Sequence, residues 1–397
     1  MPIKKRSNSA VHEDLCDVLV LGAGASGLMC ALTAAQAGAR VSLLDHASKA
    51  GVQDYVSAQA DFCGPALQAF SPARMLEWWK QHHLMWEERD HGRLFGLHSA
   101  EAFIDELGRE IKQAGVTRHM RCRVDKAQAI AADTPFFHVQ CTLLDAEGQE
   151  TDHSTYTAQR LVLALGSPAW PQAGATDTGL RLAKSFGHSI CPVRPVLVPL
   201  TMPTNWSLQG LAGISVAVEI SADNHSFTDA LLFTHQGISG PATLLASCHW
   251  RPGMPLTVNF LPEQSFVALL DAPECGKLLV KNLLSRHLPQ RLVEALLPID
   301  LAQRKVAELS RKHRLLLAQS VHVHTVVPTG TGGMRKAEAA AGGVNVAEIN
   351  PHTLESQKIP GLYFTGEVLD VAGHLGGYNL HWAFASGALA GVCAGRQ

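Results

Sequence analysis

The sequence predicts an α/β fold in which a Rossmann-like domain of the two-dinucleotide-binding type is interrupted by an inserted β-plus-helical domain. Three observations predict it. Residues 16–46 have the pattern strand, glycine-rich turn, helix, strand, and residues 361–391 read strand, turn, helix. Between them the sequence is Pro-, Val- and Leu-rich over 190–262 and has Leu-rich helical patterns over 276–318. The 397 residues, 46% of them apolar, suffice for two domains with separate cores.

The first unit of this fold begins with a short apolar strand at Val18–Leu21. The next segment is predicted to be a helix, because its apolar residues recur at i, i+3, i+4 and i+7. These residues are Leu28, Ala31, Leu32 and Ala35. Gly38 is expected to end the helix, and Val41–Leu44 is the second strand.

The remaining elements follow in order. Residues 74–92 carry a helical pattern rich in Trp and His, and Ala100–Ala114 reads as an amphipathic helix. Strands are predicted at Phe136–Leu144, near Thr155, at Leu161–Leu165 and at Gly361–Phe364, with a last helix at 380–391. We expect a loose tail at 1–14, the cofactor domain at 15–189 and 321–397, and the insert at 190–320, β-rich to 262 and helical over 276–318.

Gly22, Gly24 and Gly27 form a Gly-x-Gly-x-x-Gly motif between a strand and a helix, the context in which this motif binds dinucleotides. Gly22 permits a tight turn, Gly24 lets the backbone approach a pyrophosphate, and Gly27 allows close helix–strand packing. Asp45 lies 18 residues after Gly27, where a carboxylate can bind the ribose of adenosine. The alternative is a glycine-rich turn in an ordinary α/β domain.

The second candidate segment favours FAD over NAD. Gly366, Glu367 and Asp370 follow the closing strand, and the carboxylates can accept hydrogen bonds from the hydroxyls of a flavin ribityl chain. Gly376 and Gly377 then allow close backbone approach, and the positive end of the last helix can stabilise a reduced flavin ring. Helix capping or solvation are the alternative roles of the two carboxylates.

A separate NAD(P)H domain is not expected. Gly330–Gly333 lacks the strand and helix that a second dinucleotide motif requires, so NAD(P)H is expected to act as a transient electron donor. The pair His322 and His324 lacks a third ligand, so we expect no metal, and no Gly-x-Ser-x-Gly elbow indicates a hydrolase.

Charge and cysteine content limit the partners and the cellular compartment that we expect for this protein. The net charge is −2, but residues 277–314 hold nine Lys and Arg against three Asp and Glu. This basic segment is either a solvated helical surface or a surface for a polyanion such as RNA. Nine unpatterned cysteines, no apolar segment of a signal peptide and no run of about 18 apolar residues indicate a cytoplasmic protein without a membrane span.

The motifs together resemble the YhiN/BaiN-like family of FAD-dependent oxidoreductases, and the YhiN branch most closely. The resemblance covers nearly the whole chain. Its blocks are Gly22–Gly27, Asp45–Lys49, Gly92–Phe95, Leu232–Pro241, Ala341–Val344, Pro360–Asp370 and Gly376–Asn379. It implies a cofactor site and reduction of a conjugated C=C bond, in a steroid-like enone or, on the YhiN side, in a uracil of large-subunit ribosomal RNA. Beyond the glycines and carboxylates above, the site includes Ala25, Ser26, His46, Lys49, Gly166, Tyr378 and Asn379.

One block departs from the family pattern. Where the family has Ser-Gly-Gly-Gly-Arg-Cys-Asn beside the flavin, this chain has Ser57-Ala-Gln-Ala-Asp-Phe-Cys-Gly64. Asp61 stands in place of the arginine, and the cysteine is displaced to Cys63. The loss of a glycine nest and an arginine is expected to weaken stabilisation of an anionic flavin.

The first hypothesis is therefore an FAD-dependent reductase of a conjugated C=C bond, with hydride transfer to the β-carbon. The candidate proton donors are Cys63, Tyr378 and His235. The alternatives are a reductase of a small-molecule enone, an FAD monooxygenase, and a non-catalytic RNA-associating flavoprotein with a degraded loop.

Overall fold

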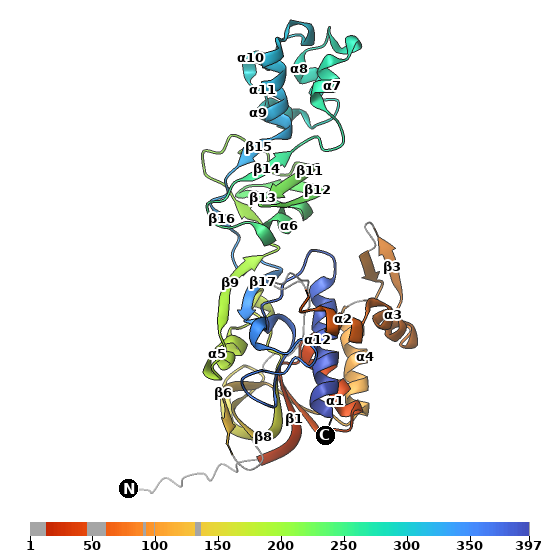
Figure 1. The fold of residues 1–397 in the computed structure, drawn as a ribbon, viewed down its shortest axis with the longest axis vertical. Helices are drawn as coiled ribbons and strands as arrows, with labels where there is room; N and C mark the ends of the chain where they lie inside the picture. The colour runs from red at the N-terminus through yellow and green to blue at the C-terminus, as the bar shows by residue number, and fades with distance from the viewer. Residues whose placement is uncertain (1–12, 46–60, 90–92, 99, 132–135, 397) are drawn as a thin grey trace, which may run out of the picture. The chain divides into compact units, whose positions relative to one another are not determined.

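The computed structural model describes residues 13–45, 61–89, 93–98, 100–131 and 136–396 (Figure 1). The chain forms two compact units. The first comprises Met1–Arg194 and Ala339–Gln397, and the second comprises Pro195–Glu338. His46 and Lys49 of the predicted site, and residues 57–60 of the divergent loop, lie outside the described residues. The second unit is thus an insert, as the change in composition predicts.

The first unit is built on a seven-stranded sheet with the order β5-β2-β1-β8-β7-β6, to which β18 adds by pairing with β8. Strands β5, β2, β1, β8 and β18 run parallel, whereas β7 is antiparallel to both of its neighbours, β8 and β6. The bounds are β1 Glu13–Leu21, β2 Val41–Asp45, β5 Thr117–Met120, β6 Cys122–Ile130, β7 Phe136–Leu144, β8 Glu150–Leu163 and β18 Leu362–Phe364. The carboxyl ends of β1, β2, β8 and β18 therefore meet at one edge, where open α/β sheets bind ligands.

Two helices from opposite ends of the sequence pack together against this sheet (Figure 1). They are α1, Ala25–Gln36, and α12, Tyr378–Gly395. Glycines of α12 face small residues of α1 at intervals of four. A Cβ atom on Gly391 would lie 2.4 Å from the carbonyl oxygen of Cys30, and one on Gly395 would lie 2.7 Å from that of Ala34. Because the paired residues advance together, the two helices run parallel.

The other elements of the first unit are shorter. They are α2 Gly64–Ala69, α3 Pro72–Gln81, the hairpin of β3 Trp86–Arg89 and β4 Arg93–Gly96, α4 Ala100–Gln113 and α5 Thr178–Ser185. The single helix predicted for 74–92 is wrong beyond Gln81, because His83 adopts a φ of 54° and the chain enters β3. The strands predicted near Thr155 and at Leu161–Leu165 are parts of one strand, β8, which ends at Leu163.

The second unit contains an antiparallel seven-stranded sheet with the order β15-β14-β11-β12-β13-β10-β16. Its strands are β10 Leu200–Thr201, β11 Ser215–Ala222, β12 His225–Thr234, β13 Gly237–Ser239, β14 Leu256–Asn259, β15 His324–Val326 and β16 Gly330–Thr331. Its helices are α6 Pro241–His249, α7 Phe266–Asp271, α8 Val280–Leu284, α9 Gln290–Leu296, α10 Ile299–Ala302 and α11 Arg311–His322. One buried core includes residues of both the sheet and the helices.

The insert ends later than the predicted residue 320. Strands β15 and β16 pair with β14 and β10, so the sheet of the second unit continues to Thr331 and the unit itself to Glu338. The strands β9, Ile190–Val196, and β17, Ala339–Val344, pair with each other where the chain leaves and re-enters the first unit. Short 3₁₀ turns lie at Pro171–Ala173, Pro273–Cys275, Val306–Glu308, Val346–Glu348 and Gly366–Val368. Across the described residues, no helix is long and apolar enough to cross a membrane.

Candidate cofactor site

The glycine motif has the backbone geometry that its sequence predicts. Gly22 follows β1 with a φ of 100°, and its N–H donates to the carbonyl oxygen of Leu44 at 2.7 Å. A Cβ atom on Gly27 would lie 1.8 Å from the carbonyl oxygen of Gly22, so only glycine allows this packing. Gly24 precedes the first turn of α1, and a Cβ atom there would have no neighbour within 4 Å. The backbone is therefore accessible at Gly24.

Asp45 lies beside this turn. It is the last residue of β2, and the pairing of Leu21 with Leu44 places it level with Gly22 on the neighbouring strand. Its side chain is buried, at 6% relative exposure. A carboxylate at this point is in the position that the sequence predicts for contact with an adenosine ribose.

The two distant motifs meet at Ser26 and Gly366. Ser26 is a buried residue in the first turn of α1, directly after Ala25. Gly366 has a φ of 72°, and a Cβ atom on it would lie 2.7 Å from the Ser26 Oγ. The Gly366 N–H donates to the Ser386 Oγ at 3.0 Å, and the Trp382 Nε1 donates to the Gly366 carbonyl at 3.2 Å. These bonds fix the Gly366 turn between α1 and α12.

The amino end of α12 presents an open backbone. Gly376 and Gly377 have φ values of 127° and 95°, and a Cβ atom on Gly377 would have no neighbour within 4 Å. No side chain caps this helix at Gly377. Because α12 runs parallel to α1, both helices direct their positive ends to the same edge of the sheet. An anionic or electron-rich ligand is favoured at that edge.

Glu367 and Asp370 bind the backbone of β17. The Glu367 Oε1 accepts a hydrogen bond from the Ala340 N–H at 3.1 Å, and its Oε2 accepts one from the Ser167 hydroxyl at 3.0 Å. The Asp370 Oδ1 accepts one from the Gly342 N–H at 3.0 Å. Both side chains are half-buried, and these hydrogen bonds attach them to β17 and Ser167.

The residues at this edge fit FAD. Gly166 follows β8 with a φ of 67°, and a Cβ atom there would have no neighbour within 4 Å, which leaves its backbone approachable. Two buried side-chain atoms at this edge have no hydrogen-bond partner among the described residues: the Thr365 Oγ1 and the Asn379 Nδ2. The Asn379 Oδ1 is held by the Gly373 N–H at 3.1 Å. Buried polar atoms of this kind are costly unless a ligand or water binds them.

The three candidate proton donors differ in their surroundings. Cys63 is half-buried at the start of α2, and burial raises the pKa of its thiol to about 12. Tyr378 is the first residue of α12 and is 57% exposed. His235 is exposed in the two-residue turn between β12 and β13, in the second unit. Tyr378 alone combines exposure with a place on the amino end of α12.

The pair His322 and His324 has a structural role. The Nε2 of His322 accepts a hydrogen bond from the Phe266 N–H at 2.9 Å, and its Nδ1 lies 2.8 Å from the Asn259 Oδ1. His324 packs edge-on against Phe260. In the part of the chain that is described, no three His, Cys, Asp or Glu side chains come together as metal ligands.

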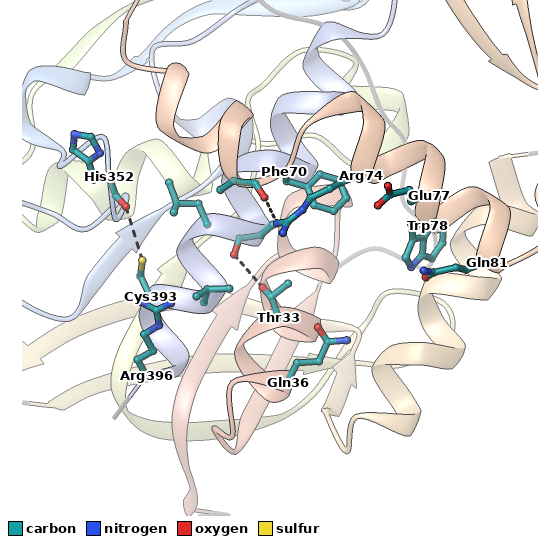
Figure 2. Close-up of a pocket in the computed structure, with 14 residues that line it drawn as sticks. Thr33, Gln36, Phe70, Arg74, Glu77, Trp78, Gln81, His352, Cys393 and Arg396 are labelled. Atoms are coloured by element: carbon teal, nitrogen blue, oxygen red, sulfur yellow. Dashed lines mark hydrogen bonds between the residues drawn. The ribbon is translucent and has the colours of Figure 1, made fainter.

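A cavity of about 590 Å³ lies at the opposite ends of α1 and α12 (Figure 2). Thr33 and Gln36 of α1, Arg74 and Trp78 of α3, and Arg396 after α12 contribute to its lining. None of the predicted cofactor or catalytic residues that the structure describes lines it. This cavity is therefore separate from the glycine turns.

Sequence patterns did not reveal several residues that support the site. Ser167, Ser386 and Trp382 hold the turn at Gly366 and Glu367, and Thr365 places a buried hydroxyl beside it. Ser167 and Thr365 lie next to the predicted glycines Gly166 and Gly366, and Trp382 and Ser386 lie in the predicted last helix, but no pattern indicated their contacts. Their partners lie up to 200 residues away.

The fold and this edge of the sheet define a Rossmann-type flavoprotein. Residues 17–82 match the profile of the FAD binding domain, and residues 51–393 match that of the HI0933-like protein Rossmann domain. The chain belongs to the HI0933-like family of FAD-dependent Rossmann proteins, which confirms the YhiN/BaiN resemblance.

Three curated relatives match almost the whole chain. A ribosomal RNA dihydrouridine synthase of Escherichia coli is 36% identical over 395 residues, which cover 93% of this chain and 96% of that protein. The protein of the same name from Haemophilus influenzae is 32% identical over 403 residues, which cover 96% of this chain and 98% of that protein. A 3-dehydro-bile acid delta(4,6)-reductase of Clostridium scindens is 27% identical over 419 residues, which cover 95% of this chain and 98% of that protein.

Proposed function

We propose that this protein is an FAD-dependent reductase that converts a uracil of large-subunit ribosomal RNA to dihydrouracil. The observation that carries the proposal is 36% identity, over 93% of the chain, to a ribosomal RNA dihydrouridine synthase. The meeting of the Gly22–Gly27 and Gly366–Asn379 segments at one sheet edge supports it, because these segments can together provide the contacts that FAD requires. The cytoplasm, where ribosomal RNA is found, is the proposed compartment.

The cofactor contacts divide along the chain. In this proposal the amino end of α1 binds the pyrophosphate through the backbone at Gly24, and Asp45 binds the ribose of adenosine. Gly166, Glu367 and Asp370 would bind the ribityl chain, and Gly376, Gly377 and Asn379 would bind the ring. The remaining proposed contacts are Ala25, Ser26, Gly22, Gly27, Gly366, Tyr378, His46 and Lys49.

A bound flavin supplies the hydride, which is added to the β-carbon of the conjugated C=C bond of the base. The protein must orient the base and deliver a proton to the adjacent carbon, so that the base gains one hydride and one proton. NAD(P)H is the proposed source of the electrons. It binds transiently, because the chain has one Gly-x-Gly-x-x-Gly motif between a strand and a helix.

Tyr378 is the proton donor that we favour. Its hydroxyl side chain is exposed on the turn that borders the proposed ring site. The thiol of Cys63 is a poor acid at neutral pH, because burial raises its pKa to about 12 and general acids work best with a pKa near the working pH. His235 lies on the other unit and remains the second candidate.

The described end of the divergent loop has a packing role. Phe62 is buried, at 4% exposure, and its ring lies edge-on to that of Trp382 at a centroid distance of 5.9 Å. Trp382 in turn donates to the Gly366 carbonyl. Phe62 therefore supports the turn at Gly366 through Trp382.

The test is an assay on RNA. Large-subunit ribosomal RNA that lacks dihydrouridine is incubated with purified protein and NADPH, digested, and analysed by mass spectrometry for uridine that has gained a pair of hydrogens. We expect a yellow protein that dithionite bleaches and that forms dihydrouridine. The control variant Gly24→Asp places a carboxylate at the pyrophosphate position and is expected to be colourless and inactive.

Three outcomes would overturn the proposal. A protein that neither contains nor takes up FAD is the non-catalytic alternative. A flavin-loaded protein that leaves RNA unchanged but reduces a steroid-like enone is the second candidate function, which the 27% identity to the bile acid reductase favours. Oxygen consumption that depends on substrate would instead indicate a monooxygenase.

A further inference from the structure

The positive charge of this protein is concentrated in one part of the second unit. Residues 277–314 carry nine Lys and Arg and three Asp and Glu. The rest of the chain carries 24 Lys and Arg and 32 Asp and Glu. A segment with an excess of six cations therefore belongs to a chain that is otherwise acidic by eight charges. The excess is local, so it does not follow from overall composition.

The structure brings six of these cations together from three segments of the chain. Residues 276–280 run antiparallel to 304–307, with the Val280 N–H donating to the Arg304 carbonyl at 3.0 Å and the Val306 N–H donating to the Leu278 carbonyl at 2.9 Å. Arg314 in the first turn of α11 donates to the Val306 carbonyl at 3.0 Å. Six cations other than Arg314, in these segments or directly beside them, are called the basic cap: Lys277, Lys281, Arg304, Lys305, Arg311 and Lys312.

The basic cap is not neutralised by the described part of the protein. Five of its side chains are exposed and that of Lys281 is half-buried, and none of the six forms an ion pair with a described residue. By contrast, Arg314 beside them pairs with Asp271 at 2.9 Å. The six cations are therefore available to an external anion.

Two of these cations, Arg311 and Lys312, lie where positive charge destabilises the protein unless an anion is bound. Arg311 and Lys312 are the first two residues of α11, whose amino end already carries partial positive charge. Its first turn contains no acidic residue. Such a placement costs stability unless a negative group lies nearby, and a bound anion supplies one.

We propose that the basic cap binds the phosphate backbone of ribosomal RNA and anchors it, while the first unit carries out the chemistry. The inference rests on the proposed function, which makes RNA the substrate. Phosphates repeat along a nucleic acid at every nucleotide, so they match unpaired cations drawn from three chain segments better than the scattered carboxylates of a protein surface. The interaction is with the backbone and is expected to be independent of base sequence.

The test compares two variants of the full-length protein with equal loss of charge. The cap variant changes Arg304, Lys305, Arg311 and Lys312 to Gln. The control variant changes four exposed cations of the first unit, Lys112, Arg118, Lys126 and Lys184, to Gln. Both are measured for binding to protein-free large-subunit ribosomal RNA over a range of salt concentrations, with flavin content from the absorption spectrum and thermal unfolding as checks on folding.

We expect the cap variant to bind RNA at least about tenfold more weakly. The slope of log affinity against log salt concentration should become less steep by about 0.9 for each duplex phosphate that the variant no longer neutralises. The control variant should bind like the unchanged protein. Reversing both Arg311 and Lys312 to Glu should weaken binding further. Steady-state assays should show a raised KM for RNA with kcat retained.

Three results would overturn the inference: equal RNA affinity of the cap variant and the unchanged protein, an equal loss in the control variant, or loss of binding to ribosomal particles with binding to protein-free RNA retained. The last result would assign the cap to a protein partner. Failure of the proposed function is distinguishable, because RNA binding that depends on the cap without dihydrouridine formation would leave the inference intact. Conversely, a cap variant that forms dihydrouridine and binds RNA with unchanged affinity would refute the inference and leave the proposed function intact.

Discussion

Gly387 of α12 lies directly against the backbone of Ser26 in α1, where a Cβ atom would be 2.3 Å from the Ser26 carbonyl oxygen. The close approach fixes the spacing of two parallel helices whose amino ends meet at the proposed cofactor edge. Real Cβ atoms do not approach a carbonyl oxygen this closely, so any larger residue at 387 must separate the helices.

Gly387→Ala and Gly391→Ala are therefore expected to destabilise the protein, each by about 1–3 kcal/mol or more, through overpacking. In an open helix the same change stabilises by about 1 kcal/mol. Gly108 in α4 is the matched control, since a Cβ atom there would meet only the end of the Arg118 side chain at 3.6 Å. Chemical denaturation of the three variants measures the difference. A loss of stability in Gly108→Ala equal to that in Gly387→Ala would refute the packing argument.

Glu367→Ala is expected to cost about 2–4 kcal/mol of stability, because it leaves the Ala340 N–H and the Ser167 hydroxyl without their acceptor. It should also weaken retention of flavin, which gel filtration followed by absorbance measures. Glu147→Ala, in an exposed turn, is the control and should change stability by no more than about 0.5 kcal/mol. Unaltered stability of Glu367→Ala would show that β17 is held by other bonds.

The stability of the protein should fall as the pH drops below about 6.5. Burial lowers the pKa of His188, whose Nε2 lies 2.9 Å from the Ser356 Oγ and whose Nδ1 lies 3.0 Å from the Glu348 Oε2. Because the folded state holds this imidazole neutral, the unfolded chain takes up a proton first as the pH falls. The stabilisation is complete above the ordinary pKa of histidine and is lost below it.

A second decline should follow between pH 4.5 and about 2. Burial raises the pKa of Glu348, but hydrogen bonds from Lys358 and Ser189 outweigh it and lower the pKa to about 2. Denaturation curves across pH measure both stages. His188→Gln should remove the upper stage and leave the lower one, and a stability that is flat from pH 7 to 5 would contradict the argument.

The same residues have the spacing of a Ser-His-Glu triad, yet the structure does not support a nucleophile. The Ser356 Oγ accepts hydrogen bonds from the Lys358 and Ile359 N–H groups at 3.0 and 2.9 Å, so both of its lone pairs are occupied. Its hydrogen then points to His188. Ser356 closes a turn rather than attacking a substrate, as the absence of a nucleophile elbow in the sequence predicts.

Cys63 should react slowly with iodoacetamide at neutral pH. Burial raises the pKa of its thiol to about 12, and the thiolate is the reactive form. Relative to an ordinary thiol, the thiolate fraction falls by roughly 10³-fold. Peptide mass spectrometry against glutathione as reference measures the rate. Alkylation as fast as that of glutathione would restore Cys63 as a candidate acid or nucleophile.

Tyr378→Phe should lower kcat for RNA reduction by about 10²-fold, the size expected for loss of a positioned general acid. Flavin spectrum and RNA affinity should stay unchanged, because the hydroxyl and not the ring is removed. His235→Gln is the comparison that decides between the two donors. A full effect in His235→Gln with none in Tyr378→Phe would transfer the role to the second unit.

The sequence alone determined the local parts of this protein. The turn at Gly22–Gly27, the strand ending at Asp45 and the last helix depend on backbone conformation and periodicity within a few residues, and the structure contains all three. The concentration of positive charge over 277–314 is also a property of the sequence itself.

Only the tertiary structure decided which distant groups meet. It brings Gly366 to Ser26, attaches Glu367 and Asp370 to the amides of β17, and joins His188 to Ser356. It also extends the inserted sheet to Thr331 through two strands of two and three residues, and the second unit to Glu338. No local pattern encodes these interactions, because each depends on the packing of segments that lie far apart in the chain, and their partners are chosen by burial and hydrogen bonding in the folded state.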